Sequence, residues 1–288
     1  MAAIRDADVD DLDAIYELLT ARSRAAFGVS QVRRDDVANA FRMNGNQSWV
    51  AVEDGAVVGH ATLNSAHDLS LAAVDPAVND DLLAHAEAAA RRRRFAFLTV
   101  YAVAEDEPLW ALVERSGFTH DRDGRRMWRT LDGDRPHPRW PDDVTVRTFE
   151  SGDGEPVKAL LDASYAGWDD AYAVRPYDDW LSFMTGHDEF DPALWFLVER
   201  NGELVACALH WKEHQNRGWV KDIVVRESER GRGLGKGLLH HAFRAYADRG
   251  VERVGLKVDS SNPTGAPQLY EKVGFVIDQR LAIWIKRL

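Results

Sequence analysis

Hydrophobic and polar positions follow the same order twice along the chain. Residues 3–5 and 145–147 each alternate as a short strand does, and each run leads into apolar residues at helical spacing. Apolar residues that recur every three or four positions are typical of one face of a helix. The pattern therefore predicts a strand and then a helix at the start of each half, and with them an internal repeat. The helical positions are Leu12, Ile15, Leu18 and Leu19 in the first half and Val157, Leu160 and Leu161 in the second.

Two further segments of each half match in the same way. Residues 49–59 and 195–206 each place two strand-like runs around a turn that contains glycine, as a β-hairpin does. Residues 112–118 and 269–275 each have the pattern of a short amphipathic helix that ends at a glycine before another strand. Strands and helices in this order predict an α/β fold with a mixed sheet in each half.

The periodicity is lost between the two halves. Residues 132–143 combine prolines, glycine and charged side chains, as a linker does. The length of 288 residues also exceeds the usual size of a single domain. We therefore expect one domain over residues 1–135, a linker over 136–143 and a second domain over 144–288.

The composition excludes several classes of protein. With 45% hydrophobic residues and no apolar run of spanning length or signal-peptide type, the sequence predicts a folded cytoplasmic protein without a membrane partner. The net charge of -11 argues against nucleic acid as a partner, because that binding depends on clustered Lys and Arg. The single cysteine, Cys207, is expected to be a buried strand residue, and no residue pattern predicts a metal site. A monomer and a homodimer both remain open.

The second half contains a glycine-rich segment where a strand is expected to run into a helix. The strand-like residues 219–225 lead through residues 230–236, Arg-Gly-Arg-Gly-Leu-Gly-Lys, into a helical pattern. Glycines at the start of a helix leave backbone NH groups uncovered at the positive end of the helix dipole, so a phosphate group can approach closely. Arg230, Arg232 and Lys236 would add positive charge around such an anion site.

The spacing of these glycines excludes two common phosphate-binding loops. A Walker A loop requires Gly where Arg230 stands, and Ser or Thr where Gly237 stands. The dinucleotide fingerprint Gly-x-Gly-x-x-Gly requires Gly at position 236 or 238, and these are Lys and Leu. We therefore do not expect a nicotinamide or flavin cofactor.

The glycine-rich segment resembles motif A of the GNAT superfamily of N-acetyltransferases, Gln/Arg-x-x-Gly-x-Gly/Ala, and matches every specified position from Arg230 to Gly235. Downstream, Asn262 and the run Leu269-Tyr270-Glu271-Lys272-Val273-Gly274-Phe275 are similar to motif B, with one extra residue between Asn and Tyr. The resemblance covers residues 144–288. It implies tandem GNAT folds, each with a mixed, mostly antiparallel sheet, helices on both faces and a splayed central pair of parallel strands.

The first half keeps the repeat but lacks these motifs. Val74 corresponds to Val225 at an offset of 225 - 74 = 151, and Gly117 corresponds to Gly274 at an offset of 274 - 117 = 157, so six residues are missing. The acidic run of residues 79–81 stands near the gap and would repel a phosphate. We expect a degenerate GNAT-like domain without an acetyl-CoA loop.

The resemblance also implies a mechanism. Acetyl-CoA would lie between the strands of residues 219–225 and 254–259, and one backbone NH there would stabilise the oxyanion as the amine attacks. Tyr270 stands at the family's general-acid position, and Asp222 is a candidate base, with water or another carboxylate as alternatives. The expected acetyl-CoA-binding residues are Ile223, Val224, Val225, Arg230, Gly231, Arg232, Gly233, Leu234, Gly235, Lys236, Asn262 and Tyr270.

The acceptor is expected to be a primary amine on a small molecule. In this family the helical region that corresponds to residues 165–180 covers the acceptor, and its aromatic and acidic side chains suit a cation. The tandem layout and His210-Trp211-Lys212 are similar to mycothiol synthases, which usually have a Thr between this Trp and Lys. An N-acetyltransferase is therefore expected. The alternatives are acetylation of the cysteinyl amine of the mycothiol precursor and a CoA-binding protein without turnover.

Overall fold

The computed structural model describes residues 2–28, 30, 32–43, 45–133, 135–166, 174–186, 189–213 and 216–288. The chain forms two compact units. Unit 1 contains Met1–Asp123, Ala173–Gly186 and Leu281–Leu288, and unit 2 contains Gly124–Tyr172 and His187–Arg280. The sequence-based division into domains 1–135 and 144–288 stays a prediction. Each of the two compact units includes a strand from the opposite half of the sequence.

Unit 1 is built on an antiparallel sheet with the strand order β1-β2-β3-β4. The predicted hairpin of residues 49–59 is confirmed as β2 and β3, which meet at a turn where Asp54 and Gly55 have positive φ. The helices and strands of unit 1 are β1 (Ala3–Asp6), α1 (Leu12–Phe27), α2 (Arg34–Arg42), β2 (Gln47–Glu53), β3 (Ala56–Leu63), β4 (Leu69–Ala73), α3 (Pro76–Arg92), β5 (Phe97–Ala102), α4 (Glu107–Arg115) and α6 (Tyr177–Thr185).

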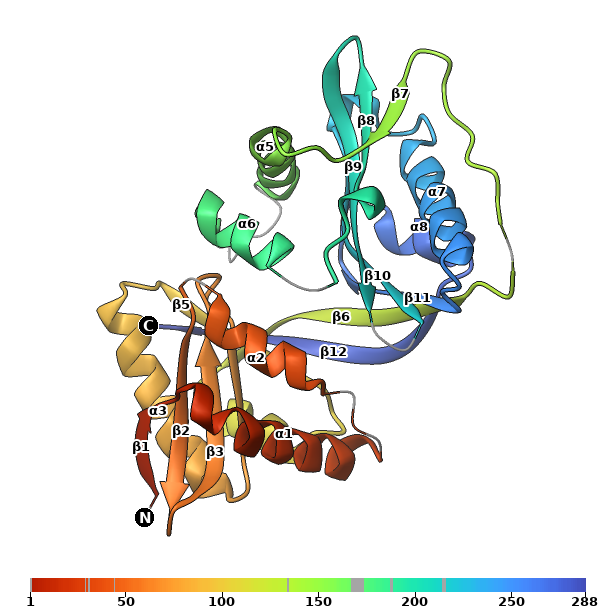
Figure 1. The fold of residues 1–288 in the computed structure, drawn as a ribbon. Coiled ribbons are helices and arrows are strands. Elements are labelled where there is room, and N and C mark those ends of the chain that lie inside the picture. Colours follow the sequence, from red (N-terminus) through yellow and green to blue (C-terminus); the bar gives the residue numbers. More distant parts are fainter. Residues whose placement is uncertain are drawn as a thin grey trace. The chain divides into compact units, whose positions relative to one another are not determined.

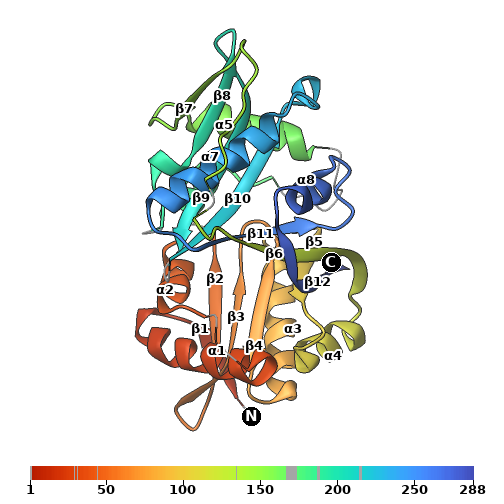
Figure 2. The same ribbon diagram turned by 90° about the vertical axis from the view of Figure 1, so that its right-hand side faces the viewer.

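Unit 2 repeats this order of strands and helices, with helices on both faces of its sheet. Figure 1 shows α5 on one side of strands β8 to β10 and α7 on the other, and Figure 2 shows α7 lying across the same strands. The predicted hairpin of residues 195–206 is confirmed as β8 and β9. The elements are β7 (Thr145–Thr148), α5 (Gly154–Tyr165), β8 (Phe196–Arg200), β9 (Glu203–Glu213), β10 (Arg217–Val225), α7 (Leu234–Asp248), β11 (Arg253–Asp259) and α8 (Ala266–Lys272).

The two halves of the sequence exchange their last strands. The strand β6 (Thr119–Thr130) ends the first half, but its residues 124–130 pair antiparallel with β11 of unit 2. The strand β12 (Val276–Arg287) ends the second half, and its residues 282–287 pair with β5 of unit 1. In unit 2 the strand order is therefore β6-β11-β10-β9-β8-β7, with β10 and β11 parallel and the other pairs antiparallel. The predicted α/β fold class is confirmed, and the sheet of unit 2 is mixed because it contains the parallel pair β10 and β11.

The core of unit 2 lies between α7 and the sheet. The apolar residues on one face of α7 are all buried against strands β8 to β11. At its C-terminal end the Tyr246 hydroxyl donates to the carbonyl of Trp211 at 2.7 Å. A Cβ at Gly218 would lie 2.5 Å from the Tyr246 ring, so only glycine lets the helix approach β10 this closely. The buried positions are Leu238, Leu239, Ala242, Phe243 and Tyr246.

No helix in the described ranges is both long enough and apolar enough to cross a membrane.

A buried histidine lies in this core and makes the stability of unit 2 sensitive to acid. His210 of β9 is fully buried between the rings of Phe196 and Tyr246, and neither of its ring nitrogens has a hydrogen-bond partner among the described residues. Burial, with a smaller contribution from His241, lowers the pKa of His210 to about 3. The unfolded chain therefore takes up a proton below its ordinary pKa of about 6.5, while the folded chain does not.

We expect His210→Phe to remove part of the acid sensitivity of folding. Because the folded pKa is lowered, the stability that neutral His210 allows is fully present above the unfolded pKa and is lost as the pH falls toward the folded value. Between about pH 7.5 and 5.5 the wild-type free energy of unfolding should fall by about 1.4 kcal/mol more than that of the variant. Urea unfolding at the two pH values measures this difference. Equal losses in the two proteins would show that His210 is solvated or partnered.

Candidate functional site

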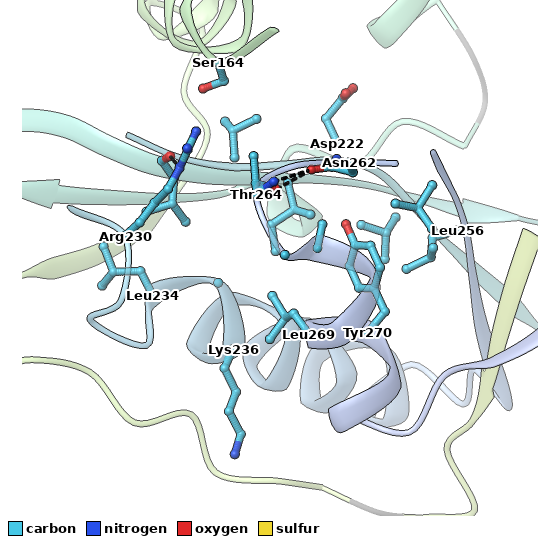
Figure 3. Close-up of a pocket in the computed structure, with 18 of the residues that line it drawn as sticks. Ser164, Asp222, Arg230, Leu234, Lys236, Leu256, Asn262, Thr264, Leu269 and Tyr270 are labelled. Carbon is cyan, nitrogen blue, oxygen red and sulfur yellow. Dashed lines mark hydrogen bonds between the residues drawn. The ribbon is translucent and has the colours of Figure 1, made fainter. Parts of the chain in front are cut away.

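The largest concentration of predicted site residues surrounds one cavity in unit 2. This cavity, of about 330 Å³, lies where β10 and β11 separate, and it is closed by the start of α7, by α8 and by the end of α5 (Figure 3). Among the residues predicted to be catalytic or to bind acetyl-CoA, all but Arg232 line it. The two sequence motifs, far apart along the chain, therefore meet at one place.

The opening between the two strands begins at a β-bulge. Parallel pairing of β10 with β11 runs from Arg217 to Val220, and Val220 pairs with Leu256. The register of β10 with β9 shifts between Val220 and Asp222, so that Lys221 is an extra residue in the strand. A bulge bends a strand and increases its twist. Beyond it β10 follows β9 and β11 follows β6, and the predicted splayed pair of strands is formed.

The start of α7 offers backbone NH groups to the cavity. Gly231 and Gly233 have φ values of 79° and 84°, which side chains rarely allow, and Gly233 is the N-cap without a side-chain hydrogen bond to the helix. The first bond of the helix runs from the Gly237 NH to the Gly233 carbonyl at 2.9 Å. The NH groups of residues 234–236 thus lie at the positive end of the helix dipole, an arrangement that binds anions.

In unit 1 the corresponding strand-to-helix junction, between β4 and α3, has its backbone NH donors already capped or absent. There β4 leads into α3 through Val74 and Asp75 alone, and the first helical residue is Pro76, which has no NH. The Asp75 carboxylate accepts a hydrogen bond from the Ala77 NH at 2.8 Å. This helix start is therefore already capped by a negative charge and offers no anion site of the kind seen at α7.

Arg232 does not line the cavity, because it belongs to a closed ring of ion pairs formed by four charged side chains. Its guanidinium contacts Glu229 and Asp143, each at 2.5 Å, and Arg200 contacts the same two carboxylates at 2.7 and 2.9 Å. Glu229 is buried, and the Arg232 guanidinium beside it holds the pKa of its carboxyl below the usual range. Arg232 also lowers the pKa of Asp143. The ring, named here the loop clamp, fastens the glycine loop to the end of β8 and to the chain before β7.

The side chains of the other two cations of the motif, Arg230 and Lys236, point in different directions. The Arg230 side chain lines the cavity, and its Nε donates to the Val225 carbonyl at 3.3 Å. The Lys236 side chain extends away from Asn262 and Tyr270 (Figure 3). Gly235, in the first turn of α7, faces α8, and a Cβ there would come within 3.1 Å of Leu269. Among the three cations of the motif, Arg230 is therefore the one whose side chain faces the cavity beside the backbone donors.

Tyr270 of α8 brings a neutral hydroxyl to the gap between the strands. Its ring packs on Phe275 with 5.8 Å between ring centroids, and its hydroxyl lies on the side that faces Asn262 and Asp222 (Figure 3). Burial, and then the negative charge of Asp222, raise the pKa of Tyr270 well above its usual value of 10.0. A hydroxyl that keeps its proton at neutral pH is able to donate it.

Asp222 lies on the other side of the strands, where α5 ends. The Tyr165 hydroxyl donates a hydrogen bond of 2.9 Å to Asp222 Oδ1. Figure 3 shows the Asp222 carboxylate on the side of the strands where Ser164 of α5 lies. Sequence reasoning grouped Tyr165 with the acceptor cover and did not predict this bond, because 57 positions separate the two residues. A carboxylate and a phenol thus reach the gap from opposite faces of the sheet.

Asn262 shapes the loop that leads into α8. Its Oδ1 accepts hydrogen bonds from the Thr264 NH at 2.9 Å and from the Thr264 hydroxyl at 2.5 Å. Gly265, the N-cap of α8, has a φ of 76°. This side-chain turn sets where the helix that carries Tyr270 begins.

The predicted acceptor cover is only partly within the described structure. Residues 167–173, with Trp168, Asp169, Asp170 and Tyr172, lie outside the described residues, as does His214. Residues 177–185 form α6 of unit 1. In the ranges that the structure describes, no group of three or more His, Cys, Asp and Glu residues is arranged to hold a metal ion.

Comparison with known proteins agrees with this geometry. Residues 156–275 match the model of the acetyltransferase (GNAT) family. A mycothiol acetyltransferase of Streptomyces coelicolor is 30% identical in an alignment 286 positions long, which covers 93% of this chain and 89% of the relative.

Two solved structures are similar over almost the whole chain. A GCN5-related N-acetyltransferase from Sphaerobacter thermophilus aligns with a TM-score of 0.77 and 27% identity over 99% of this chain and 95% of that one. A tandem GNAT protein from the clavulanic acid biosynthesis pathway aligns with a TM-score of 0.75 and 17% identity, over 100% of this chain and 98% of that one, and so shares the fold. The anion site, the splayed strands and these likenesses lead to one conclusion: the chain belongs to the acetyltransferase (GNAT) family.

Proposed function

We propose that this N-acetyltransferase moves the acetyl group of acetyl-CoA to a primary amine of a small molecule by direct attack within a ternary complex. The observation that carries the proposal is the single cavity that joins the open helix start of α7, the gap between β10 and β11, and the Tyr270 hydroxyl. Acetyl-CoA supplies the activated acetyl group as a thioester. The residues present fit it, since the glycine loop has NH donors for a pyrophosphate and no side chain that would obstruct it.

The backbone of β10 is the proposed support for the rest of acetyl-CoA. Residues 223–225 pair with β9 on one edge and line the cavity with the other. An exposed strand edge binds an extended amide-containing ligand as a further strand would bind. A backbone NH of this edge would also stabilise the negative charge that develops on the acetyl oxygen during attack.

Two proton transfers are assigned to residues on opposite sides of the gap. Asp222, held by the Tyr165 hydroxyl, receives the proton that the attacking ammonium must lose, directly or through water. Tyr270 donates a proton to the thiolate as it leaves, and its raised pKa keeps the hydroxyl protonated until that step. The acceptor would therefore enter from the face of the sheet on which α5 lies.

The cysteinyl amine of the mycothiol precursor is the second candidate acceptor. It is favoured by the similarity to mycothiol acetyltransferases over most of the chain. The first half is proposed to be a degenerate copy that supports the fold, because its equivalent helix start is capped by Asp75. We place the reaction in the cytoplasm.

The proposed activity is tested by supplying amines. We expect the purified protein to release CoA and to form the N-acetyl product with at least one primary amine from a panel of amino acids, polyamines, aminoglycosides and the mycothiol precursor. Mass spectrometry identifies the products, and thiol release measures the rate. Acetylation of alcohols or thiols alone would contradict the assignment of an amine acceptor.

Tyr270→Phe should lower kcat by about 10- to 1,000-fold, because a positioned general acid contributes roughly 10²- to 10⁴-fold and water replaces part of it. The dissociation constant of acetyl-CoA should change little, since the ring still packs on Phe275. Tyrosine ionisation would produce an alkaline limb in the wild-type rate profile, and this limb should lie above pH 10 and be missing in the variant. A variant that keeps full kcat with chemistry rate-limiting would make Tyr270 a packing residue.

Glu229→Gln should weaken acetyl-CoA binding by roughly 10-fold, because it removes the charge of a buried carboxylate from two partly exposed ion pairs that hold the glycine loop. The kcat at saturating acetyl-CoA should remain close to that of the wild type. Glu227→Gln, in the same turn but exposed and outside the loop clamp, is the matched control. Calorimetry measures the dissociation constant of acetyl-CoA in each variant. Tighter binding in Glu229→Gln would contradict the supporting role of the loop clamp, because it would mean that the released Arg232 binds the phosphate itself.

A further inference from the structure

Three tryptophans form a row across four strands of unit 2. Trp219 of β10 pairs with Trp211 of β9 on one side and with Gly255 of β11 on the other, and Gly255 pairs in turn with Trp128 of β6. Residues that stand opposite each other on neighbouring strands share a face of the sheet. The tryptophan row, meaning Trp211, Trp219 and Trp128, therefore lies on one face.

A glycine on the intervening strand lets two of these indoles meet. The ring centroids of Trp128 and Trp219 are 5.6 Å apart with an interplanar angle of 66°. A Cβ at Gly255 would lie 2.7 Å from both rings, so any other residue there would force them apart. The Arg253 guanidinium lies over the Trp128 ring at 4.6 Å and holds it from the side. Trp211 is buried, while Trp219 and Trp128 are half-buried, so the ring faces of these two are the accessible part of the row.

The tryptophan row shares its face with Asp222. Along β9, Leu209 and Trp211 point to one face and His210 to the other, where it contacts Tyr246 of α7. Asp222 pairs with Leu209 and Trp219 pairs with Trp211, so both are on the face opposite α7. This is the face from which Tyr165 reaches Asp222.

The bulge brings the row close to the proposed point of attack. Because Lys221 is an extra residue, Trp219 and Asp222 lie on one face although three positions separate them. Two ordinary steps along a strand cover about 7 Å. Lys221 lies next to both the cavity and the tryptophan row. It lines the cavity, and its Nζ lies 5.6 Å from the Trp211 ring centroid.

We propose that the tryptophan row binds a six-membered ring of the acceptor about 7 Å from the amine that is acetylated. The proposal rests on the proposed acetyl transfer to an amine and specifies the acceptor of that site. Indole faces stack on flat apolar surfaces, which an aromatic ring and the CH face of a sugar both offer. The acceptor is thus a cyclic amine derivative, such as an aminoacyl sugar or an arylalkylamine.

The charges beside the row argue against an open-chain polyamine. Arg253 lies over Trp128 and Lys221 lies near Trp211, so a second ammonium of the acceptor would approach two cations at the indoles. A neutral ring meets no such repulsion. The surroundings therefore favour one ammonium at Asp222 and an uncharged ring over Trp219.

The test compares three primary amines on the full-length chain. Tyramine and glycyl-glucosamine carry an aromatic ring and a sugar ring, while n-hexylamine carries none. Wild-type protein should have a kcat/KM for at least one ring-bearing amine that exceeds that for n-hexylamine, and the better of tyramine and glycyl-glucosamine tells which ring the site takes. Binding of each amine to the CoA-bound protein is measured in parallel by saturation-transfer NMR.

Trp219→Leu should lower kcat/KM for the preferred ring-bearing amine by about 5- to 20-fold through KM, and should lower kcat/KM for n-hexylamine much less. Trp219→Phe, which keeps an aromatic face, should restore most of the loss. Trp110→Leu is the matched control, because Trp110 forms a similar edge-to-face pair with Trp284 in unit 1.

The outcomes separate this inference from the proposed function. Equal losses for all amines in Trp219→Leu, or no wild-type preference for a ring, would overturn the inference while acetyl transfer stands. Ring-dependent binding that Trp219→Leu abolishes, without acetyl transfer to any amine, would support the inference and overturn the proposed function.

Discussion

The parallel pairing of β10 with β11 cannot continue past Val220, and most of the site depends on this interruption. The extra residue Lys221 shifts the register of β10 against β9, so the two strands follow different neighbours from that point. The same shift opens a cavity in the middle of a sheet, leaves one edge of residues 223–225 toward it, and places Asp222 on the face of Trp219. One inserted residue therefore sets the gap, the strand edge and the approach to the carboxylate together.

The glycine loop needs external support because its own chemistry makes it weak. Residues with positive φ and no side chains make few contacts, and a helix start without a cap leaves donors unsatisfied. The structure compensates with the loop clamp and with Trp140, whose ring would lie 2.7 Å from a Cβ at Gly237 in the first turns of α7. Unit 1 shows the opposite solution, in which Asp75 and Pro76 stabilise the helix start and no donors remain for a ligand.

Local features of the site could be predicted from the sequence, and features that join distant segments could not. The positive φ of Gly231 and Gly233 follows from residue type and spacing, and the helix face of α7 follows from its periodicity. The contact of Arg232 with Asp143 spans 89 positions, and a charged residue beside two glycines is as well suited to a phosphate as to a carboxylate. The register of β10 and the exchange of β6 and β12 depend on which strands meet, which periodicity does not specify. The roles of Tyr270, Asp222 and the glycine-loop residues remain predictions.

The exchanged strands bear on how this chain is made and on what can be removed from it. A ribosome that has completed residues 1–135 has not yet supplied the partner of β5, and residues 144–288 alone would leave β11 with an open edge beside the site. A truncation that removes either strand would therefore leave an unpaired strand edge, and such edges promote aggregation. The first half of the chain thus contributes directly to the sheet of the site: β11, which borders the cavity, pairs with a strand that lies more than 120 residues upstream.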